Sequence, residues 1–192
     1  MNNCVCLYLK ENGLEVHYKP PALTSLRTNF PIFLNGHNKF KFSILIVRGD
    51  DKSYIEDGLL RCLSLSTEIS NKYNTISVGI VHKNSPHDIL PGMDTHTYGY
   101  HLNDGAIYFG GKSLANFYSR YDVGDVIGVS ANKEKKTIKF KKNGTSVCVL
   151  PMYDKILPQD WYACIGFART KAVIRTSFGG YGEIIDHLLA IF

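Results

Sequence analysis

Residues 137–150 read TIKFKKNGTSVCVL and contain the clearest local signal in the chain. Residues 137–142 alternate between polar and apolar side chains, and residues 145–150 alternate again, as strands packed on one face do. Asn143 and Gly144, which lie between them, tolerate the positive φ angles that a type I′ turn requires at both central positions. The stretch therefore predicts a β-hairpin with its tip at Asn143-Gly144.

Strand patterns recur on both sides of this hairpin. They cover residues 4–9, 14–18, 40–46, 76–80, 125–129, 161–167 and 173–178. Only the tail, residues 183–192, changes period, with Ile184, Ile185, Leu188 and Leu189 on one face of a short helix. Many short strands separated by turns are typical of an antiparallel sandwich. We therefore predict an all-β antiparallel β-sandwich with a short C-terminal helix.

The length of the chain, 192 residues, suits a single domain over residues 1–192 with its own hydrophobic core. Residues 49–74 are polar apart from a small leucine kernel, and we interpret them as an insertion between two strands. No apolar run is long enough to span a membrane, and no secretory signal is visible. The five cysteines are scattered, which favours reduced thiols and a cytoplasmic location.

Several turn motifs, taken in order, resemble those of a SPRY domain. They are LPGMD at 90–94, TYGYH at 97–101, NDG at 103–105, VGDVIG at 123–128 and FKKNG at 140–144. Residues 14–19, 25–32 and 177–179 are similar to the RanBPM-like branch, the Ran-binding-protein-like scaffolds of the CTLH (GID) ubiquitin ligases. The resemblance implies a SPRY-type β-sandwich that acts as an adaptor in protein–protein interaction.

The chain also departs from that branch. Met93 stands where the branch usually carries Trp, and the insertion at 49–74 is longer than the usual turn. Because the sequence stops at Phe192, we expect it to lack the LisH, CTLH and CRA segments of full-length relatives.

Catalytic and metal-binding patterns are weak in this sequence. Four histidines lie close together, but their spacings match no metal-ligand pattern: His82, His87, His96 and His101. We expect His101 to have a structural hydrogen-bonding role. Cys148 and Cys164 fall inside predicted strands, where a thiol is usually a small buried hydrophobe. The stretch GGKS at 110–113 lacks the first glycine and the helix of a phosphate-binding loop. We therefore expect neither enzyme activity nor a cofactor.

The loops at the ends of a sandwich are free to vary, so we expect function to lie there. The expected ligand is a peptide or a protein surface, such as a ubiquitin-ligase component. The predicted partner-binding residues are Arg27, Met93, Asp94, Tyr118, Tyr121 and Trp161. Arg27 could pair with a carboxylate of the partner, and the aromatic residues are typical anchors. For Trp161 and Tyr98, however, a place in the core is the stronger expectation, and Asp94, Asp104 and Asp125 fit turns.

The net charge is +5, and lysines crowd into one short stretch: Lys133, Lys135, Lys136, Lys139, Lys141 and Lys142. In the interpretation we favour, Lys139 and Lys141 face water, and Ile138 and Phe140 face the core. Lysines there would also protect a sheet edge from aggregation. The alternative is a patch for phosphate backbones, which would make the protein a basic RNA- or ribosome-associated factor.

Overall fold

The computed structural model describes residues 7–10, 15–18, 23–28, 30–33, 36–48, 75–116, 122–153, 160–168, 172–179 and 189–190. The elements in these ranges are β-strands. The predicted insertion at 49–74 lies outside the described residues, as do Tyr118 and Tyr121.

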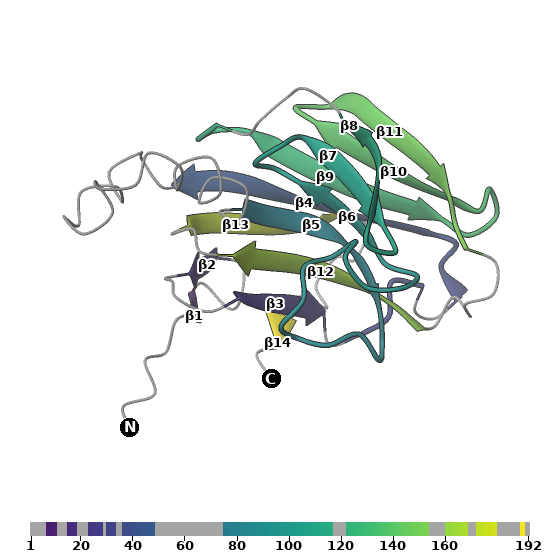
Figure 1. The fold of residues 1–192 in the computed structure, drawn as a ribbon, viewed down its shortest axis with the longest axis horizontal. Helices are drawn as coiled ribbons and strands as arrows, with labels where there is room; N and C mark the ends of the chain where they lie inside the picture. Colours follow the sequence, from purple (N-terminus) through teal and green to yellow (C-terminus); the bar gives the residue numbers. More distant parts are fainter. Residues whose placement is uncertain are drawn as a thin grey trace.

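The strands form two antiparallel sheets that lie face to face (Figure 1). Sheet A runs in the order β1 (Leu7–Lys10), β2 (Glu15–Tyr18), β13 (Ala172–Gly179), β4 (Lys39–Arg48), β9 (Val126–Asn132), β10 (Thr137–Lys142) and β11 (Thr145–Pro151). Sheet B runs in the order β14 (Leu189–Ala190), β3 (Leu23–Thr28), β12 (Trp161–Ala168), β5 (Thr75–His82), β6 (Tyr98–His101), β7 (Ala106–Phe109) and β8 (Lys112–Asn116). The predicted antiparallel β-sandwich is confirmed.

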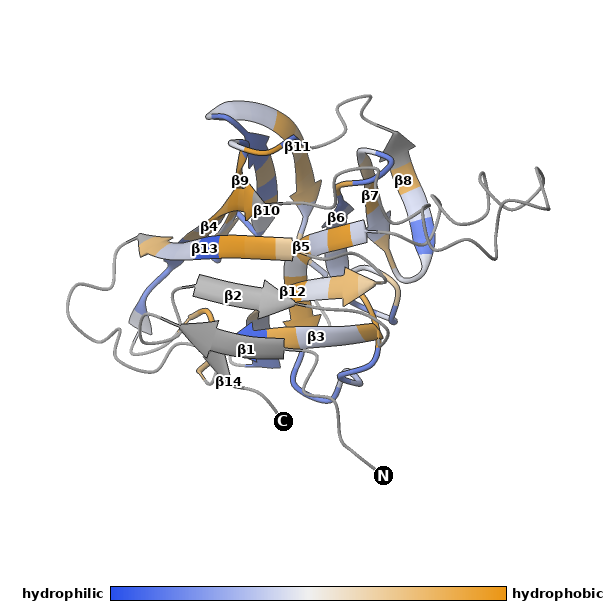
Figure 2. Ribbon diagram, turned by 90° about the vertical axis from the view of Figure 1, so that its left-hand side faces the viewer, coloured by the Kyte–Doolittle hydropathy of each residue, from blue (hydrophilic) through white to orange (hydrophobic). Residues whose placement is uncertain are grey.

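The hydrophobic core fills the space between the two sheets, and Figure 2 shows hydrophobic residues along the strands of both layers. The period-two pattern of β4 turns Phe40, Phe42, Ile44 and Ile46 inward, and all four are buried. From sheet B come the buried side chains Ile76, Val78, Ile80, Tyr98, Tyr100, Trp161, Ile165 and Phe167. Aromatic rings from different strands pack together, with the Tyr98 and Trp161 ring centroids 5.6 Å apart. Tyr98 and Trp161 are thus core residues.

The hairpin at 137–150 forms as predicted. The φ angles of Asn143 and Gly144 are 49° and 81°, as a type I′ turn requires. Ile138 and Phe140 are fully buried, and Lys139 and Lys141 alternate with them on the other face. However, β10 lies between β9 and β11, so β11 is the edge strand. The expectation that these lysines protect an edge is therefore wrong, because that position belongs to the second strand of the hairpin.

The predicted C-terminal helix is wrong for the two tail residues that the structure describes. Leu189 and Ala190 form β14, which pairs with Thr28 and Arg27 at the edge of β3. The open edge of β3 offers backbone groups that need hydrogen-bond partners, and an extended tail can supply them.

Within the described part of the chain, no helix is long and apolar enough to cross a membrane.

The connection between β5 and β6, residues 83–97, folds back over the outer face of sheet B. It lies so close to the sheet that a Cβ atom on Gly99 would sit 1.9 Å from the Pro91 carbonyl oxygen. A Cβ atom on Gly166 would come within 2.7 Å of both Leu90 and Pro91 side-chain atoms. Glycine at these two strand positions therefore creates the space in which Leu90 and Pro91 rest.

We predict that Gly99→Ala destabilises the protein by about 1–3 kcal/mol or more, because the new methyl group overlaps backbone rather than a movable side chain. Gly128→Ala in β9 is the matched control, since its Cβ would meet nothing closer than 3.7 Å. That change should be neutral or stabilise by up to about 1 kcal/mol. Urea unfolding of both variants measures the difference, and equal free energies of unfolding would contradict the close approach.

Candidate functional site

The middle of the β5–β6 connection is fixed to sheet B by hydrogen bonds to one carbonyl group. The Pro91 oxygen accepts from Ser77 Oγ at 3.2 Å and lies 2.9 Å from His101 Nε2. Residues further along are tied as well, since Gly92 N donates to Thr97 Oγ1 at 3.1 Å and Gly111 N donates to Gly92 O at 2.8 Å. The connection is thus held in one conformation without regular secondary structure.

His101 is the buried member of this arrangement. Burial lowers its pKa below the ordinary value, although the Pro91 carbonyl and Asp104 act in the opposite direction. The neutral ring therefore carries its proton on Nε2, where it donates to Pro91. The ring also packs on Tyr108, with the centroids 4.3 Å apart. The predicted structural role of His101 is confirmed.

Arg27 holds the first part of the connection. Its Nη1 donates to the Lys83 carbonyl at 2.7 Å, and its Nη2 lies 3.0 Å from His87 Nε2. Burial and the Arg27 charge both lower the pKa of His87, so a neutral His87 accepts from the guanidinium. The guanidinium carbon also lies 5.9 Å from the centre of the Tyr162 ring. Arg27 thus has partners within the chain, and its contact with another protein stays a prediction.

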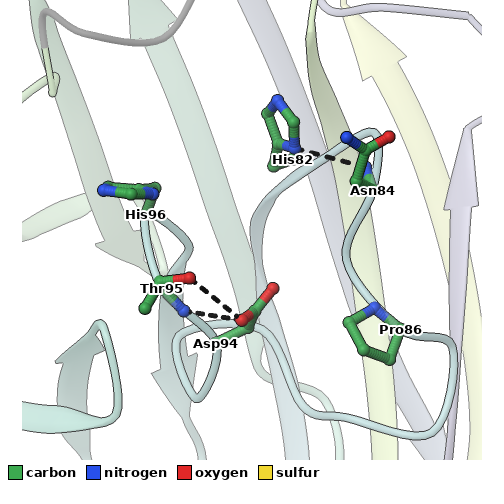
Figure 3. Close-up of a pocket in the computed structure, with 6 residues that line it drawn as sticks. All are labelled: His82, Asn84, Pro86, Asp94, Thr95 and His96. Carbon is green, nitrogen blue, oxygen red and sulfur yellow. Dashed lines mark hydrogen bonds between the residues drawn. The ribbon is translucent and has the colours of Figure 1, made fainter.

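Between the two arms of the connection is a shallow pocket of about 260 Å³ (Figure 3). The first arm contributes Asn84 and Pro86, together with His82 at the end of β5, and the second contributes Asp94, Thr95 and His96. We call these six residues the loop pocket.

Hydrogen bonds within each arm fix the shape of the loop pocket. Asn84 N donates to His82 Nδ1 at 3.2 Å, and Thr95 N donates to Asp94 Oδ1 at 2.7 Å. Ser85 Oγ reaches from the first arm to Asp94 Oδ2 at 2.8 Å. The turn role predicted for Asp94 is therefore confirmed, and this side chain also joins the two arms.

His96 shapes the second arm through its backbone. Its φ angle is 64°, which is uncommon for a residue other than glycine. In this conformation its ring stacks on Tyr153, with the centroids 4.4 Å apart. His96 thereby links the loop pocket to the segment that follows β11.

Charged and apolar groups lie around the loop pocket. Lys83 Nζ is 2.9 Å from Asp160 Oδ1, and His82 Nε2 is 3.9 Å from Asp160 Oδ2. The Met93 side chain is 40% exposed, which makes it one of the large hydrophobic residues on the surface. The site thus combines polar groups held in place with one exposed thioether, a composition suited to non-covalent recognition.

Among the described residues, no group of three or more His, Cys, Asp or Glu side chains could hold a metal ion. Cys164 is buried, and burial raises the pKa of its thiol to about 12, which disfavours the reactive thiolate. Cys148 is half-buried, and its pKa is also raised by burial. Gly110 and Gly111 form a turn that leads into strand β8, where a phosphate-binding loop would lead into a helix.

Of the predicted partner-binding residues, Asp94 lines the loop pocket and Met93 precedes it in the chain. Arg27 contacts the first part of the connection at Lys83 and His87. Trp161 is fully buried and unavailable to a partner, because its ring completes the core beside Tyr98. The prediction that Trp161 is a partner-binding anchor is therefore wrong, and Trp161 is a core residue.

Sequence reasoning missed most of the lining of the loop pocket. The sequence pattern predicts neither a metal-binding nor a catalytic role for His82 and His96, and it indicates no role for Asn84, Pro86 and Thr95. The signal available was the run of turn-forming residues at 83–97 between two strand patterns.

A family model described as "SPRY domain" matches residues 66–181. Ran-binding protein 9 of Danio rerio is 28% identical over 183 residues, which cover 93% of this chain and 26% of that protein. The human Ran-binding protein 9 is also 28% identical, with 93% of this chain and 22% of that protein covered. The Ran-binding proteins 9/10 homolog of Drosophila melanogaster is 24% identical, with 96% of this chain and 18% of that protein covered. The chain thus spans about a quarter or less of these relatives.

Solved structures are similar in fold. The crystal structure of a human SPRY domain has a TM-score of 0.62 and 21% identity, with 89% of this chain and 94% of that chain covered. The SPRY domain of human HERC1 has a TM-score of 0.58 and 15% identity, with coverages of 92% and 94%.

We predict that the protein loses stability in acid partly through His101. The folded-state pKa lies below the ordinary value of 6.5, so the unfolded chain binds more protons between those two values. The free energy of unfolding should therefore fall as the pH drops below about 6.5, and this contribution should level off below the folded-state pKa. Urea unfolding between about pH 7 and pH 5 measures the effect.

His101→Gln keeps an N–H donor for Pro91 and removes the titration, so its stability should depend less on pH than that of the wild type. His37→Gln, at an exposed position, is the control. A His101→Gln profile parallel to that of the wild type would rule out His101 as a source of acid sensitivity.

Proposed function

The chain belongs to the SPRY domain family, and we propose on that premise that it is a non-catalytic protein-interaction module. Its ligand is a peptide or a protein surface. This ligand binds at the loop pocket and at the adjoining residues Arg27 and Met93. The observation that carries this proposal is the β5–β6 connection, which is fixed to sheet B by the Pro91 carbonyl and still exposes Met93.

A fixed connection favours binding because little conformational entropy is lost when the ligand arrives. Ser77 and His101 hold the middle of the connection, and Arg27 holds its first part. The polar groups of the loop pocket are therefore positioned before any ligand is present. A rigid surface of this kind is suited to selecting one ligand over another.

The size of the loop pocket indicates how the ligand is bound. A volume of about 260 Å³ accommodates one or two side chains, so the rest of the ligand would lie across the rim. Met93 supplies apolar contact there, and Lys83 and Asp160 supply charge of both signs. An extended segment with one inserted side chain fits these features.

The relatives suggest the setting of this interaction. The similarity of this chain to Ran-binding proteins 9 and 10 supports placing it in the RanBPM-like branch. We extend the proposal to an adaptor role in the cytoplasm, with a ubiquitin-ligase component as a candidate partner.

The test is affinity capture from nuclease-treated lysate, followed by measurement of the dissociation constant for the purified partner. Met93→Ala should weaken binding by about 1 kcal/mol or more, roughly fivefold, as is typical of an anchor residue. Leu114→Ala is the matched control, because Leu114 is 49% exposed on β8. Arg27→Ala should also weaken binding, since it releases the first part of the connection.

An interaction that is lost on nuclease treatment, yet is unchanged by Met93→Ala and Arg27→Ala, would overturn this proposal. Equal losses with Met93→Ala and Leu114→Ala would also speak against the loop pocket as the site.

A further inference from the structure

The outer face of sheet A carries basic residues and no acidic ones over most of its width. Its five neighbouring strands β13, β4, β9, β10 and β11 read AVIRTSFG, KFKFSILIVR, VIGVSAN, TIKFKK and TSVCVLP, without a single Asp or Glu. Because side chains alternate along a strand, the apolar half of these residues faces the core and the lysines face outward. The result is a surface of one sign.

The strand register places lysines from distant parts of the chain beside one another. Lys41 of β4 pairs with Ser130 of β9, and Ser130 pairs with Lys139 of β10. The backbones of Lys41 and Lys139 are therefore two strand spacings apart, about 10 Å. Lys141 follows Lys139 on the same strand, and Lys39 precedes Lys41. We call Lys39, Lys41, Lys139 and Lys141 the basic face.

These lysines are not neutralised by acidic neighbours within the described part of the chain. Lys142, by contrast, lies 2.8 Å from Asp125. Burial works to raise the pKa of Asp125, but hydrogen bonds from Lys142 and Asn143 outweigh it and hold the pKa below its usual value. Lys39 and Lys41 are exposed, and Lys139 and Lys141 are half-buried.

The basic face differs from the lysine cluster seen in the sequence. Lys133, Lys135 and Lys136 lie in the turn between β9 and β10, and Lys142 is paired at the hairpin tip. Only Lys139 and Lys141 of that cluster belong to the basic face, and β4 supplies the other two members. The surface is thus a product of strand pairing.

We propose that the basic face binds the phosphate backbone of RNA without reading its sequence. Lysine ammonium groups neutralise phosphates, and the residues between them, Ser43, Ser130, Asn132 and Thr137, carry side-chain donors of the kind that contact phosphate oxygens. The outward positions of these strands hold no aromatic ring on which a base could stack, so binding does not depend on sequence.

An anionic membrane is the less suitable occupant. Peripheral membrane binding depends on apolar side chains that enter the lipid boundary as well as on charge. The lysine rows here are separated by Ser, Asn and Thr, and the exposed apolar side chains of these strands are two short valines on different strands, Val126 and Val149. The basic face also lies on sheet A, whereas the loop pocket belongs to the β5–β6 connection on sheet B (Figure 1). RNA and a protein ligand therefore have separate sites.

The experiment measures fluorescence anisotropy of a labelled oligouridylate of about 16 nucleotides against salt concentration. Each lysine engaged on a single strand adds about 0.7 to the slope of log affinity against log salt, so Lys41, Lys139 and Lys141 together contribute about 2. That contribution weakens binding about 20-fold between about 50 and 200 mM salt. The variant with all three changed to Gln should lose this contribution.

Two further variants keep the test decisive. Lys112→Gln with Lys133→Gln and Lys135→Gln removes the same charge from exposed lysines off the basic face and should keep the wild-type slope. Changing Lys41, Lys139 and Lys141 to Arg keeps the charge and should also keep the slope. Thermal unfolding confirms that each variant is folded, since all of these side chains are outside the core.

Three results would overturn the proposal: no binding of the oligonucleotide by the wild type, an unchanged slope in the folded Gln variant of the basic face, or an equal loss in the off-face variant. Vesicles of phosphatidylcholine and phosphatidylserine are tested in parallel. Binding to these vesicles without binding to the oligouridylate would assign the basic face to membranes and would also overturn the proposal.

Discussion

The contact of Pro91 with the backbone of β6 is the constraint on which the functional end of this protein depends. Leu90 and Pro91 rest on Gly166 and Gly99, and the Pro91 carbonyl receives hydrogen bonds from Ser77 and His101. A side chain at Gly99 would occupy the position of that carbonyl oxygen. Because Pro91 is buried, the hydrogen bonds of its carbonyl group must be made within the protein, and this placement of the connection makes them.

This placement orders the residues on either side of it. The first arm reaches back to Arg27 through Lys83 and His87, and the second arm reaches Tyr153 through His96. Asp94 and Ser85 then join the arms across the loop pocket. The connection has no regular secondary structure, and these contacts hold it in place. Met93 remains exposed on it, as the proposed binding of a ligand requires. Under the proposed function, the same hydrogen bonds serve both stability and binding.

The two sheets divide the remaining chemistry between them. Sheet B carries the β5–β6 connection with mixed charge, including the Lys83–Asp160 ion pair. In sheet A, strands β4 and β10 present lysines on the outer face, and the described residues of these strands include no Asp or Glu. Charge of one sign on a flat surface attracts an extended polyanion at long range, whereas a shaped pocket with both signs discriminates at short range. The proposed protein and RNA ligands correspond to these two kinds of surface.

The sequence by itself determined the sandwich class, the hairpin at 137–150 and the inward residues of β4, because period-two alternation and turn chemistry are local properties. The partner-binding roles of Arg27, Met93 and Asp94 stay predictions, and Arg27 lies in strand β3 beside the connection. Only the tertiary structure decided that β10 is an inner strand, that Leu189 and Ala190 extend beside β3, and that Trp161 is buried. It alone placed Lys41 and Lys139 on either side of Ser130 and brought the two arms of the loop pocket together. The physical reason is that strand order and loop docking depend on contacts between residues far apart in the chain, which no local pattern encodes.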